Sequence, residues 1–596
     1  MAKAKKSNIL IAGYPSYISN LLGNRGITTK EEADFFVSAG YEDLRNPYTA
    51  KGIPEAVELT KECIQNGVKI CIFGDYDADG VLSSCVMETG LTNCGANSYV
   101  RLPCRITEGY GISMKAVKEL VNNDVGLIIT VDNGIRAVEE IKYAIEHGVK
   151  VIILDHHIMG ETLPIANVIV DLHREDETFG YSDLAGVGVA FLFIRALYKQ
   201  FGIEDDKCKE LLDLVAIGTV ADCVPLTGEN RILVREGLKV INDTSYNRKG
   251  ILAILRRNNI TGKVTSTDIG FKIGPVINAP GRLLEQGAQR AFQMVMSNDE
   301  NGWAEAEFLM RINQERKELT QEGVKKAENY IEDMKMQDDN IYVLYLENQP
   351  EGIIGLISGK ITEKYKKPSV VFTDDAHGTL KASGRAPSCD FDENARQIDL
   401  YECLTSCGGL FIKYGGHSQA AGMSIEKDKL ETLKKGLNLF IEDNYNKEEL
   451  LLEDFYEMEI EENEITPEFM EKLDLLEPCG MGNPKPLIKI KDFKLIKRKV
   501  QSGSFQKYCP LGAEQLSVNL YGNKIDALCF GLAQEYHDLK EPDVLDLYCT
   551  LEKSYKYGVE TYNALVNRFE IPEEKQDYGQ ADNNLLDEIS NLAALL

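Results

Sequence analysis

The most informative segment of the chain is Val149-Lys150-Val151-Ile152-Ile153-Leu154-Asp155-His156-His157. Its apolar run predicts a β-strand, and one aspartate and two histidines follow directly where that strand ends. Because the chain contains only seven histidines, two neighbouring ones at a strand exit indicate a functional site.

The same arrangement occurs twice upstream. The run Lys69–Phe73 is followed by Gly74-Asp75-Tyr76-Asp77-Ala78-Asp79-Gly80, and the run Leu127–Val131 is followed by Asp132-Asn133-Gly134. The ends of parallel strands meet at one edge of an open sheet, where ligands bind. Amphipathic stretches such as Ile135–His147 alternate with these runs, which favours a parallel α/β sheet. The sequence therefore predicts a metal-dependent phosphoesterase.

The residue types at these strand exits suit a divalent metal site. Hard carboxylate oxygens with few imidazoles favour Mn²⁺ or Mg²⁺ over a thiolate-rich zinc site. We expect Asp77 and Asp79 to face one centre from two angles, and Asp132 to contact two ions. His156 would supply a nitrogen ligand, and Asp222, at the end of an apolar helical stretch, a further carboxylate.

For four further acidic or histidine residues, the surrounding sequence indicates a role less clearly. Asp75 is either a further metal ligand or a turn-forming residue, and both interpretations stay open. We expect Asp155 to orient His156 by a hydrogen bond. For His147 and His173 the sequence favours an ordinary surface position.

Composition restricts the class of protein only broadly. The formal net charge of −28 argues against nonspecific coating of nucleic acid, although Lys485–Lys499 is a local basic stretch. No apolar run approaches the roughly 20 residues that a membrane span needs. Fourteen cysteines without a CxxC pair indicate reduced thiols. We therefore expect a cytoplasmic protein with no membrane association.

The pattern along the chain predicts several domains. Trp303–Met334 is rich in helix-forming residues and predicts a long helix that joins two lobes. A second α/β segment begins at Ile341, and short alternating runs up to Phe569 predict a small β-barrel of the OB type. The predicted segments are 1–65 helical, 66–302 catalytic α/β, 303–336 connecting helix, 337–448 second α/β, 449–570 OB-like barrel and 571–596 acidic tail.

Several motifs identify the chain as similar to a known family. The segments GDYDADG (74–80), VDNG (131–134), DHH (155–157) and GTVAD (218–222) resemble those of the DHH phosphoesterase superfamily. Further segments resemble its RecJ branch, the single-strand-specific 5′-to-3′ DNA exonucleases: Leu184–Phe191, Asn278–Leu283 and Gly415–Gly422. The resemblance spans roughly residues 20 to 570.

This resemblance implies a DHH domain and a smaller DHHA1 domain joined by a long helix and followed by an OB domain. It implies a ligand set in which Asp132 bridges two ions: Asp77, Asp79, Asp132, His156 and Asp222. His157 would face the scissile phosphate and, with Arg282, stabilise charge on it. The other implied phosphate-binding positions are Asn278, Ser383, Gly384, Arg385, Gly416 and His417.

A basic track on the barrel would guide the nucleic acid. We expect it to include Lys489, Lys491, Phe493 and Lys494, with Phe493 and Phe505 stacking on bases. The alternatives are that the two phenylalanines belong to the barrel core and that the lysines form a solvated strand face.

The predicted function is 5′-to-3′ hydrolysis of single-stranded DNA by a two-metal mechanism in DNA repair and recombination. The direction follows from the resemblance alone. We expect a monomer and, as a partner, a helicase or single-strand-binding protein. One alternative is a DHH-type phosphodiesterase of short oligonucleotides or cyclic dinucleotides. Another is a catalytically silent replication or defence scaffold.

Overall fold

A computed structural model describes residues 3–5, 7–260, 262–375, 378–388, 396–446, 455–499, 505–511, 516–556 and 559–572. Its internal contacts divide the chain into two compact units. One unit, here called the catalytic unit, contains Gly40–Leu452 and Pro478–Gly482; the other, the barrel unit, contains Met1–Ala39, Glu453–Glu477 and Asn483–Leu596. The predicted acidic tail lies outside the described residues from residue 573 onward.

The catalytic unit begins with a five-stranded parallel sheet, as the alternating pattern predicts. The strands lie in the order β3 (Asn97–Arg101), β2 (Lys69–Phe73), β4 (Leu127–Val131), β5 (Lys150–Asp155) and β6 (Val168–Asp171). All four pairings are parallel. The carboxyl ends of the strands therefore share one edge, which is where the predicted site residues follow.

Helices cover both faces of this sheet, so its central strands β2, β4 and β5 are largely apolar and buried. On one face, α5 (Met114–Asn122) and α6 (Val138–Glu146) pack against side chains such as Cys71, Ile128 and Val151. The intervening strand residues point to the opposite face, which contacts α4 (Ala78–Asn93) and α7 (Gly186–Phe201). Helix α3 (Ile53–Gln65) packs against α7 and β6.

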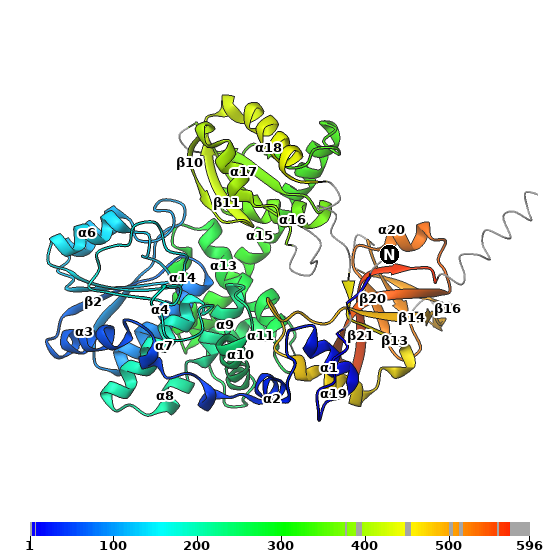
Figure 1. The fold of residues 1–596 in the computed structure, drawn as a ribbon, viewed down its shortest axis with the longest axis horizontal. Helices are drawn as coiled ribbons and strands as arrows, with labels where there is room; N and C mark the ends of the chain where they lie inside the picture. Colours follow the sequence, from blue (N-terminus) through cyan, green and yellow to red (C-terminus); the bar gives the residue numbers. More distant parts are fainter. Residues whose placement is uncertain are drawn as a thin grey trace, which may run out of the picture. The chain divides into compact units, whose positions relative to one another are not determined.

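A helical region follows, and its last helix leads into the second lobe (Figure 1). The helices before it are α8 (Asp205–Lys209), α9 (Leu212–Ala221), α10 (Gly228–Ile241), α11 (Lys249–Arg257), α12 (Ser266–Asp268), α13 (Gly274–Leu283) and α14 (Gly287–Met296). Helix α15 then runs for 34 residues, Glu300–Asp333. It contacts α13 before the second lobe and α16 (Glu351–Tyr365) within it. The prediction of a long helix that joins two lobes is confirmed.

The second lobe is a mixed sheet between two layers of helices. Its strand order is β10 (Phe411–Gly416), β11 (Ala420–Ile425), β9 (Leu380–Arg385), β8 (Ser369–Asp374) and β7 (Tyr342–Tyr345). One face packs against α15 and α16 through residues such as Ile331 and Ile357. The other packs against α17 (Leu400–Ser406) and α18 (Leu430–Asn444). The predicted second α/β domain is thus present.

The barrel unit contains a seven-stranded sheet. Its strand order is β13 (Met458–Glu461), β14 (Ile488–Lys494), β20 (Val544–Lys556), β21 (Val559–Glu570), β19 (Asp526–Cys529), β18 (Ser517–Tyr521) and β17 (Tyr508–Leu511). The remaining elements are β12 (Phe455–Tyr456), α19 (Pro467–Leu473), β15 (Arg498–Lys499), β16 (Phe505–Gln506) and α20 (Ala533–Asp538).

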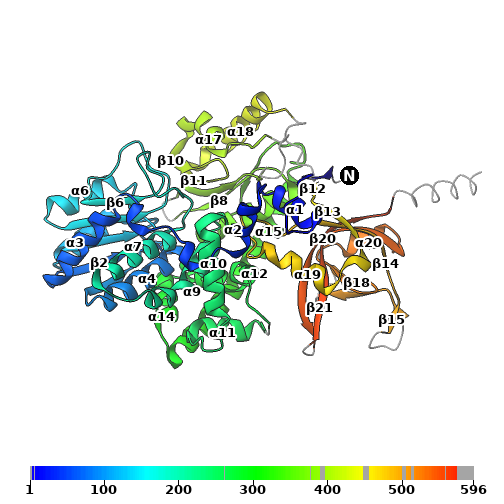
Figure 2. The same ribbon diagram turned by 60° about the horizontal axis from the view of Figure 1, so that its bottom comes forward.

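The first helices of the chain belong to this barrel unit. Strand β1 (Lys3–Ala4) pairs in parallel with β12, and α1 (Ser16–Gly23) lies beside α19 in both views (Figures 1 and 2). Arg25, just before α2 (Lys30–Ser38), donates to Glu457 Oε2 at 2.8 Å and to the Pro484 carbonyl at 2.6 Å. The predicted segment 1–65 is divided between the units, because α3 lies in the catalytic unit. The exact domain bounds remain predictions.

Among the described residues, no helix combines the length and the apolar character that crossing a bilayer requires.

Candidate metal centre and phosphate-facing cleft

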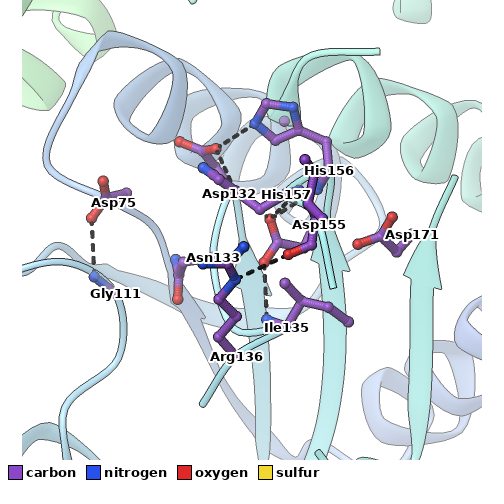
Figure 3. A network of polar contacts seen from close by, with 12 residues as sticks. Asp75, Gly111, Asp132, Asn133, Ile135, Arg136, Asp155, His156, His157 and Asp171 are labelled. Atoms are coloured by element: carbon purple, nitrogen blue, oxygen red, sulfur yellow. Dashed lines mark hydrogen bonds and ion pairs between the residues drawn. The ribbon is translucent and has the colours of Figure 1, made fainter. Parts of the chain in front are cut away.

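The structure brings the predicted metal ligands together at the carboxyl edge of the parallel sheet. Figure 3 shows Asp75, Asp132 and His156 of this cluster. Three groups of side chains each place their ligand atoms within 4.8 Å of one another. They are Asp79, His156 and Asp222; Asp75, Asp77 and Asp132; and Asp132, His156 and His157. Asp132 and His156 each belong to two groups, so they lie where the groups meet.

Asp77 and Asp79 are positioned by the start of helix α4. Asp77 is the N-cap residue, and its Oδ1 accepts a hydrogen bond from the Gly80 N–H at 3.1 Å. Asp79 accepts from the Gly186 and Val187 N–H groups, at 2.6 and 2.9 Å, at the start of α7. A helix N-terminus favours a carboxylate in this way. A Cβ on Gly186 would lie 2.7 Å from the Asp132 Cβ, so this close approach requires glycine.

Asp132 and His156 come into contact at the end of adjacent strands. Asp132 has φ 61°, a left-handed conformation that aspartate tolerates better than most residues. Its Oδ1 lies 3.0 Å from the His156 Nε2. The same nitrogen lies 3.8 Å from Asp79 Oδ2 and 3.7 Å from Asp222 Oδ2. His156 therefore sits among carboxylates from three different elements.

The electrostatics of this cluster favour a bound cation. Burial, and then the neighbouring aspartates, raise the pKa of Asp79 to about 7 and those of Asp132 and Asp222 well above the ordinary value. Burial, and then the charge of His157, lower the pKa of His156 to about 3, so its imidazole is neutral. Carboxylate oxygens with one neutral imidazole match the ligand preferences of Mn²⁺ and Mg²⁺. The residues present thus fit such an ion.

Asp75 lies in the same cluster. It is buried, with Oδ1 accepting from the Gly111 N–H at 3.4 Å. Burial and the adjacent Asp77 charge raise the pKa of Asp75 well above its usual range. This environment supports the metal-ligand interpretation over that of a simple turn residue, although its role remains a prediction.

Asp155 contacts both histidines, because it accepts from the backbone N–H of His156 and holds the ring of His157. Its orienting role toward His156 stays a prediction. Asp155 Oδ1 lies 2.8 Å from the His157 Nδ1, whereas His156 donates to this carboxylate through its backbone N–H and not through its ring. The reason is local geometry, because the His156 ring turns toward Asp132. Burial alone would raise the pKa of Asp155, but the hydrogen bond and charge of His157 lower it. The same pairing raises the pKa of His157 despite its burial.

Tyr110 contacts His157, although the sequence predicts no role for this residue. Its hydroxyl lies 3.1 Å from both ring nitrogens of His157, with the rings edge to face. The segment Glu108-Gly109-Tyr110-Gly111 has no strand-exit pattern, and its resemblance to RecJ sequences is the signal that marks it.

Three guanidinium groups converge beside the metal cluster. Arg282 of α13 donates to the Gly352 carbonyl at 3.1 Å, and Arg385 of β9 donates to Ser383 Oγ at 3.0 Å. Burial, and then the charge of Arg105, lower the pKa of Arg282 to about 10 and also lower that of Arg385. Arg105 also lies over the Tyr76 ring, 5.0 Å from its centroid. Such mutual repulsion is relieved by an anion such as phosphate. Sequence reasoning missed Arg105.

The other predicted phosphate-binding residues occupy different places. Asn278 Oδ1 accepts from the Ala78 N–H at 2.8 Å, so it fastens the start of α4. Gly384 packs in β9 beside Leu400. Gly416 is the last residue of β10 and His417 follows it; both line a cavity of about 800 Å³ together with His156 and His157. Burial, and then Arg385, lower the pKa of His417.

The predicted track on the barrel needs correction at Phe493. Its side chain is fully buried, so it belongs to the core and cannot stack on a base. The reason is a register irregularity between Ile490 and Phe493, with Asp492 at φ 47°. This bulge shifts the strand alternation and turns Phe493 inward. The side chain of Phe505 lies outside the described residues.

The lysines of this track differ in their exposure and in their ion pairs. Lys489 is largely buried and pairs with Asp546 at 2.9 Å. Lys491 pairs with Glu459 at 3.3 Å, while Lys494 is exposed. Among these three residues, Lys494 is the one best placed to meet a polyanion.

Comparisons with known families match three parts of the chain. The model of the DHH family N-terminal domain matches residues 69–219, the DHHA1 domain matches 338–443, and the RecJ OB domain matches 456–568. The parallel sheet, the mixed-sheet lobe and the barrel unit correspond to these three matches. The fold and these matches thus assign the chain to the DHH class of proteins, and the predicted OB-like domain is confirmed.

Individual relatives narrow this assignment. Proteins named single-stranded-DNA-specific exonuclease RecJ are 34% identical in Haemophilus influenzae, over 75% of this chain and 78% of that protein, and 32% identical in Escherichia coli, over 80% and 84%. The Bacillus subtilis protein of that name is 34% identical over 80% of this chain, which spans 58% of the relative's length. The chain belongs to the RecJ family.

Solved structures agree with this assignment. The crystal structure of RecJ in complex with Mn²⁺ from Thermus thermophilus matches with a TM-score of 0.75 and 26% identity, over 94% of this chain and 76% of that one. A structure of exonuclease RecJ bound to manganese matches with a TM-score of 0.56 and 30% identity, over 67% and 96%.

Proposed function

We propose that this chain is a Mn²⁺- or Mg²⁺-dependent exonuclease that hydrolyses single-stranded DNA from its 5′ end. One observation carries the proposal: a buried carboxylate–imidazole cluster lies beside three converging guanidinium groups in one compact unit. The cluster suits divalent cations, and the guanidiniums suit phosphates. The names of the relatives, single-stranded-DNA-specific exonucleases, supply the substrate.

The proposed metal ligands are Asp77, Asp79, Asp132, His156 and Asp222, with Asp75 as an additional oxygen donor. Bound ions would supply a nucleophilic water and neutralise charge on the phosphoryl oxygens. Asp132 is proposed to contact both ions, because it belongs to two of the three ligand groups. The neutral state of His156 leaves its Nε2 lone pair available for coordination.

His157 is proposed to donate a hydrogen bond to the scissile phosphate. Asp155 accepts from its Nδ1 and favours the protonated ring. The protonated form of the ring would stabilise the negative charge that increases on the phosphate in the transition state. Tyr110 packs on the ring edge and restricts its rotation.

The guanidinium groups of Arg105, Arg282 and Arg385 are proposed to hold the 5′-terminal phosphate. Arg282 and Arg385 are fixed by hydrogen bonds to Gly352 and Ser383. Guanidinium groups bind phosphate through paired N–H donors, and such a fixed cluster favours a terminal phosphate, which carries more charge than an internal one.

The barrel supports long DNA over the alternative of short oligonucleotides. The RecJ OB domain match covers residues 456–568, and OB folds bind single strands. The retained carboxylates and histidines argue against a catalytically silent scaffold. We further propose a monomer in the cytoplasm that acts in DNA repair and recombination with a helicase or single-strand-binding protein.

Purified protein with Mn²⁺, Mg²⁺ or EDTA tests this proposal on long DNA labelled at either end. We expect mononucleotides to appear first from the 5′ label, on single strands but not on blunt duplexes, and only with a metal. Comparison with a dinucleotide substrate addresses the main alternative. Faster turnover of the dinucleotide than of the long strand, or digestion from the 3′ end, would refute the proposal.

A further inference from the structure

Two neighbouring strands end in the same Asp-x-His arrangement. Asp155 of β5 and Asp171 of β6 are direct partners in the parallel register. Each is followed two residues later by a histidine, His157 or His173. The sequence alone favours a surface position for His173, because the apolar run before it is short and does not clearly predict a strand.

The hydrogen bonds of the two pairs are alike. Asp155 Oδ1 lies 2.8 Å from the His157 Nδ1 and accepts from its backbone N–H at 3.3 Å. Asp171 Oδ1 lies 3.4 Å from the His173 Nδ1 and accepts from its backbone N–H at 2.9 Å. Both aspartates are buried, while the histidine side chains keep 39% and 32% exposure. The second ring nitrogen of His157 contacts the Tyr110 hydroxyl, and the second ring nitrogen of His173 would contact a different partner.

Both histidines line the 800 Å³ cavity that the edge of the parallel sheet shares with strand β10. Lys413 and Arg136 line it with positive charge, and Asp183 and Glu140 with negative charge. His173 is close enough for its charge to lower the pKa of His156. Among the described residues, Asp171 and His173 form no three-ligand group that could hold a metal.

The order of groups along the sheet edge suggests a path for the substrate. Arg105 follows β3, and the metal cluster follows β2, β4 and β5. His157 follows β5, and His173 follows β6, the last strand of the sheet. Adjacent strands lie about 4.8 Å apart, so a polyanion that crosses the strand ends meets these groups one after another.

We propose that His173 binds the DNA phosphate on the 3′ side of the scissile phosphate, through a hydrogen bond from its Nε2–H. This inference rests on the proposed function and extends it along the strand. Asp171 holds the Nδ1 side of the ring and so presents Nε2 to the cavity. The hydrogen bond to Asp171, acting against partial burial, also raises the pKa of His173, which favours the charged form that binds phosphate.

A chemical double-mutant cycle tests the proposal. His173→Ala is combined with substrates in which one phosphate, either 5′ or 3′ of the scissile one, is replaced by a neutral methylphosphonate. The control is His147→Ala, since His147 is exposed and bonds the Tyr143 carbonyl within α6. Steady-state kinetics report kcat and KM, and thermal melting reports folding.

We expect His173→Ala to raise KM about tenfold with little change in kcat, as for one charge-assisted hydrogen bond. Neutralising the 3′ phosphate should impose a similar loss on the wild type and little further loss on the variant. The inference would be overturned if the effects of His173→Ala and of the neutral 3′ phosphate were independent and multiplied. Unchanged kinetics in His173→Ala would also overturn it. If His173→Ala melts early, His173→Gln takes its place in the same cycle. A wild type that cleaves no single-stranded DNA would instead refute the proposed function.

Discussion

The Nε2 atom of His156 lies 3.0 Å from Oδ1 of Asp132, although the two residues are 24 positions apart and end different strands. This contact joins the ligand group that contains Asp79 and Asp222 to the one that contains Asp75 and Asp77. A single change at this junction should therefore disturb both groups at once.

Asp132→Asn should reduce metal-dependent nuclease activity by more than about 100-fold. Asparagine tolerates the left-handed backbone at this position, so the variant should fold. Its metal-free form should melt no earlier than the wild type, because one buried carboxylate is removed. Asp124→Asn is a matched control, since Asp124 also has a positive φ, 56°, but is exposed. Retained manganese-dependent turnover would refute the bridging role.

Asp155→Asn should lower kcat by about 10- to 100-fold, because the acceptor that orients the His157 ring loses the negative charge that favours the protonated form of the ring. Substrate binding should change less, since the Arg105–Arg282–Arg385 cluster is untouched. Kinetics on a 5′-phosphorylated strand separate kcat from KM. Asp243→Asn serves as the control, because that exposed carboxylate bonds only within its own turn. A change in KM alone would contradict this role.

Metal removal should destabilise the protein more at pH 8 than at pH 5. In the metal-free protein the pKa of Asp79 is raised to about 7 by burial and then by Asp77. A carboxyl group with a folded pKa above its unfolded value of about 4 loses stability as pH rises between the two values. A bound cation removes that penalty. The gap in Tm between Mn²⁺ and EDTA should therefore widen from pH 5 to pH 8.

The same melting experiment on Asp222→Asn is compared with that on the wild type, because the variant lacks one carboxyl group whose pKa is raised. Its gap in Tm should depend less steeply on pH. A gap that is constant with pH in the wild type would contradict the electrostatic account.

Arg385→Lys should raise KM for 5′-phosphorylated DNA by roughly tenfold while leaving the fold intact. Lysine keeps the charge but loses the planar donors that bond Ser383 Oγ and the Gly384 carbonyl. Arg396→Lys is the control, an exposed arginine of the same lobe. The effect should be smaller on DNA with a 5′-hydroxyl. Equal effects on both substrates would argue against binding of the terminal phosphate.

Phe493→Leu should lower the stability of the barrel unit by about 1–3 kcal/mol, because a fully buried ring is replaced by a smaller side chain. Lys494→Ala should leave the melting temperature unchanged and weaken binding of long single strands. Thermal melting and fluorescence anisotropy measure the two effects. Weakened binding with unchanged stability in Phe493→Leu would restore a stacking role for that ring.

Much of the fold and of the metal cluster could be predicted because strand periodicity and strand exits are local features. The apolar composition of runs such as Lys69–Phe73 predicts that they are buried strands. An acidic residue that directly follows such a strand lies at the edge of the sheet. The convergence of Asp77, Asp132 and His156 follows from parallel pairing alone. Their roles as ligands still await experiment.

The positions of the remaining site residues are set by tertiary contacts, which a short segment of sequence does not indicate. Arg105 lies in a loop, and the distance between it and Arg282 is set by tertiary packing. Phe493 was misjudged because a single bulge at Asp492 reverses the alternation. The surface position predicted for His173 takes no account of a repeat, because Asp171-Leu172-His173 has the same spacing as Asp155 and His157.

The shared unit formed by the first helices and the barrel strands has a consequence for synthesis. Arg25 and its partner Glu457 are 432 residues apart. At about 5–20 residues per second, a ribosome needs roughly 20 to 90 seconds to make the stretch between them. Helix α1 is synthesised first, but the barrel strands that it packs against are made only after the catalytic unit has been synthesised. During that interval its apolar side chains are a natural target for chaperones, and the barrel unit is the last part of the protein to fold.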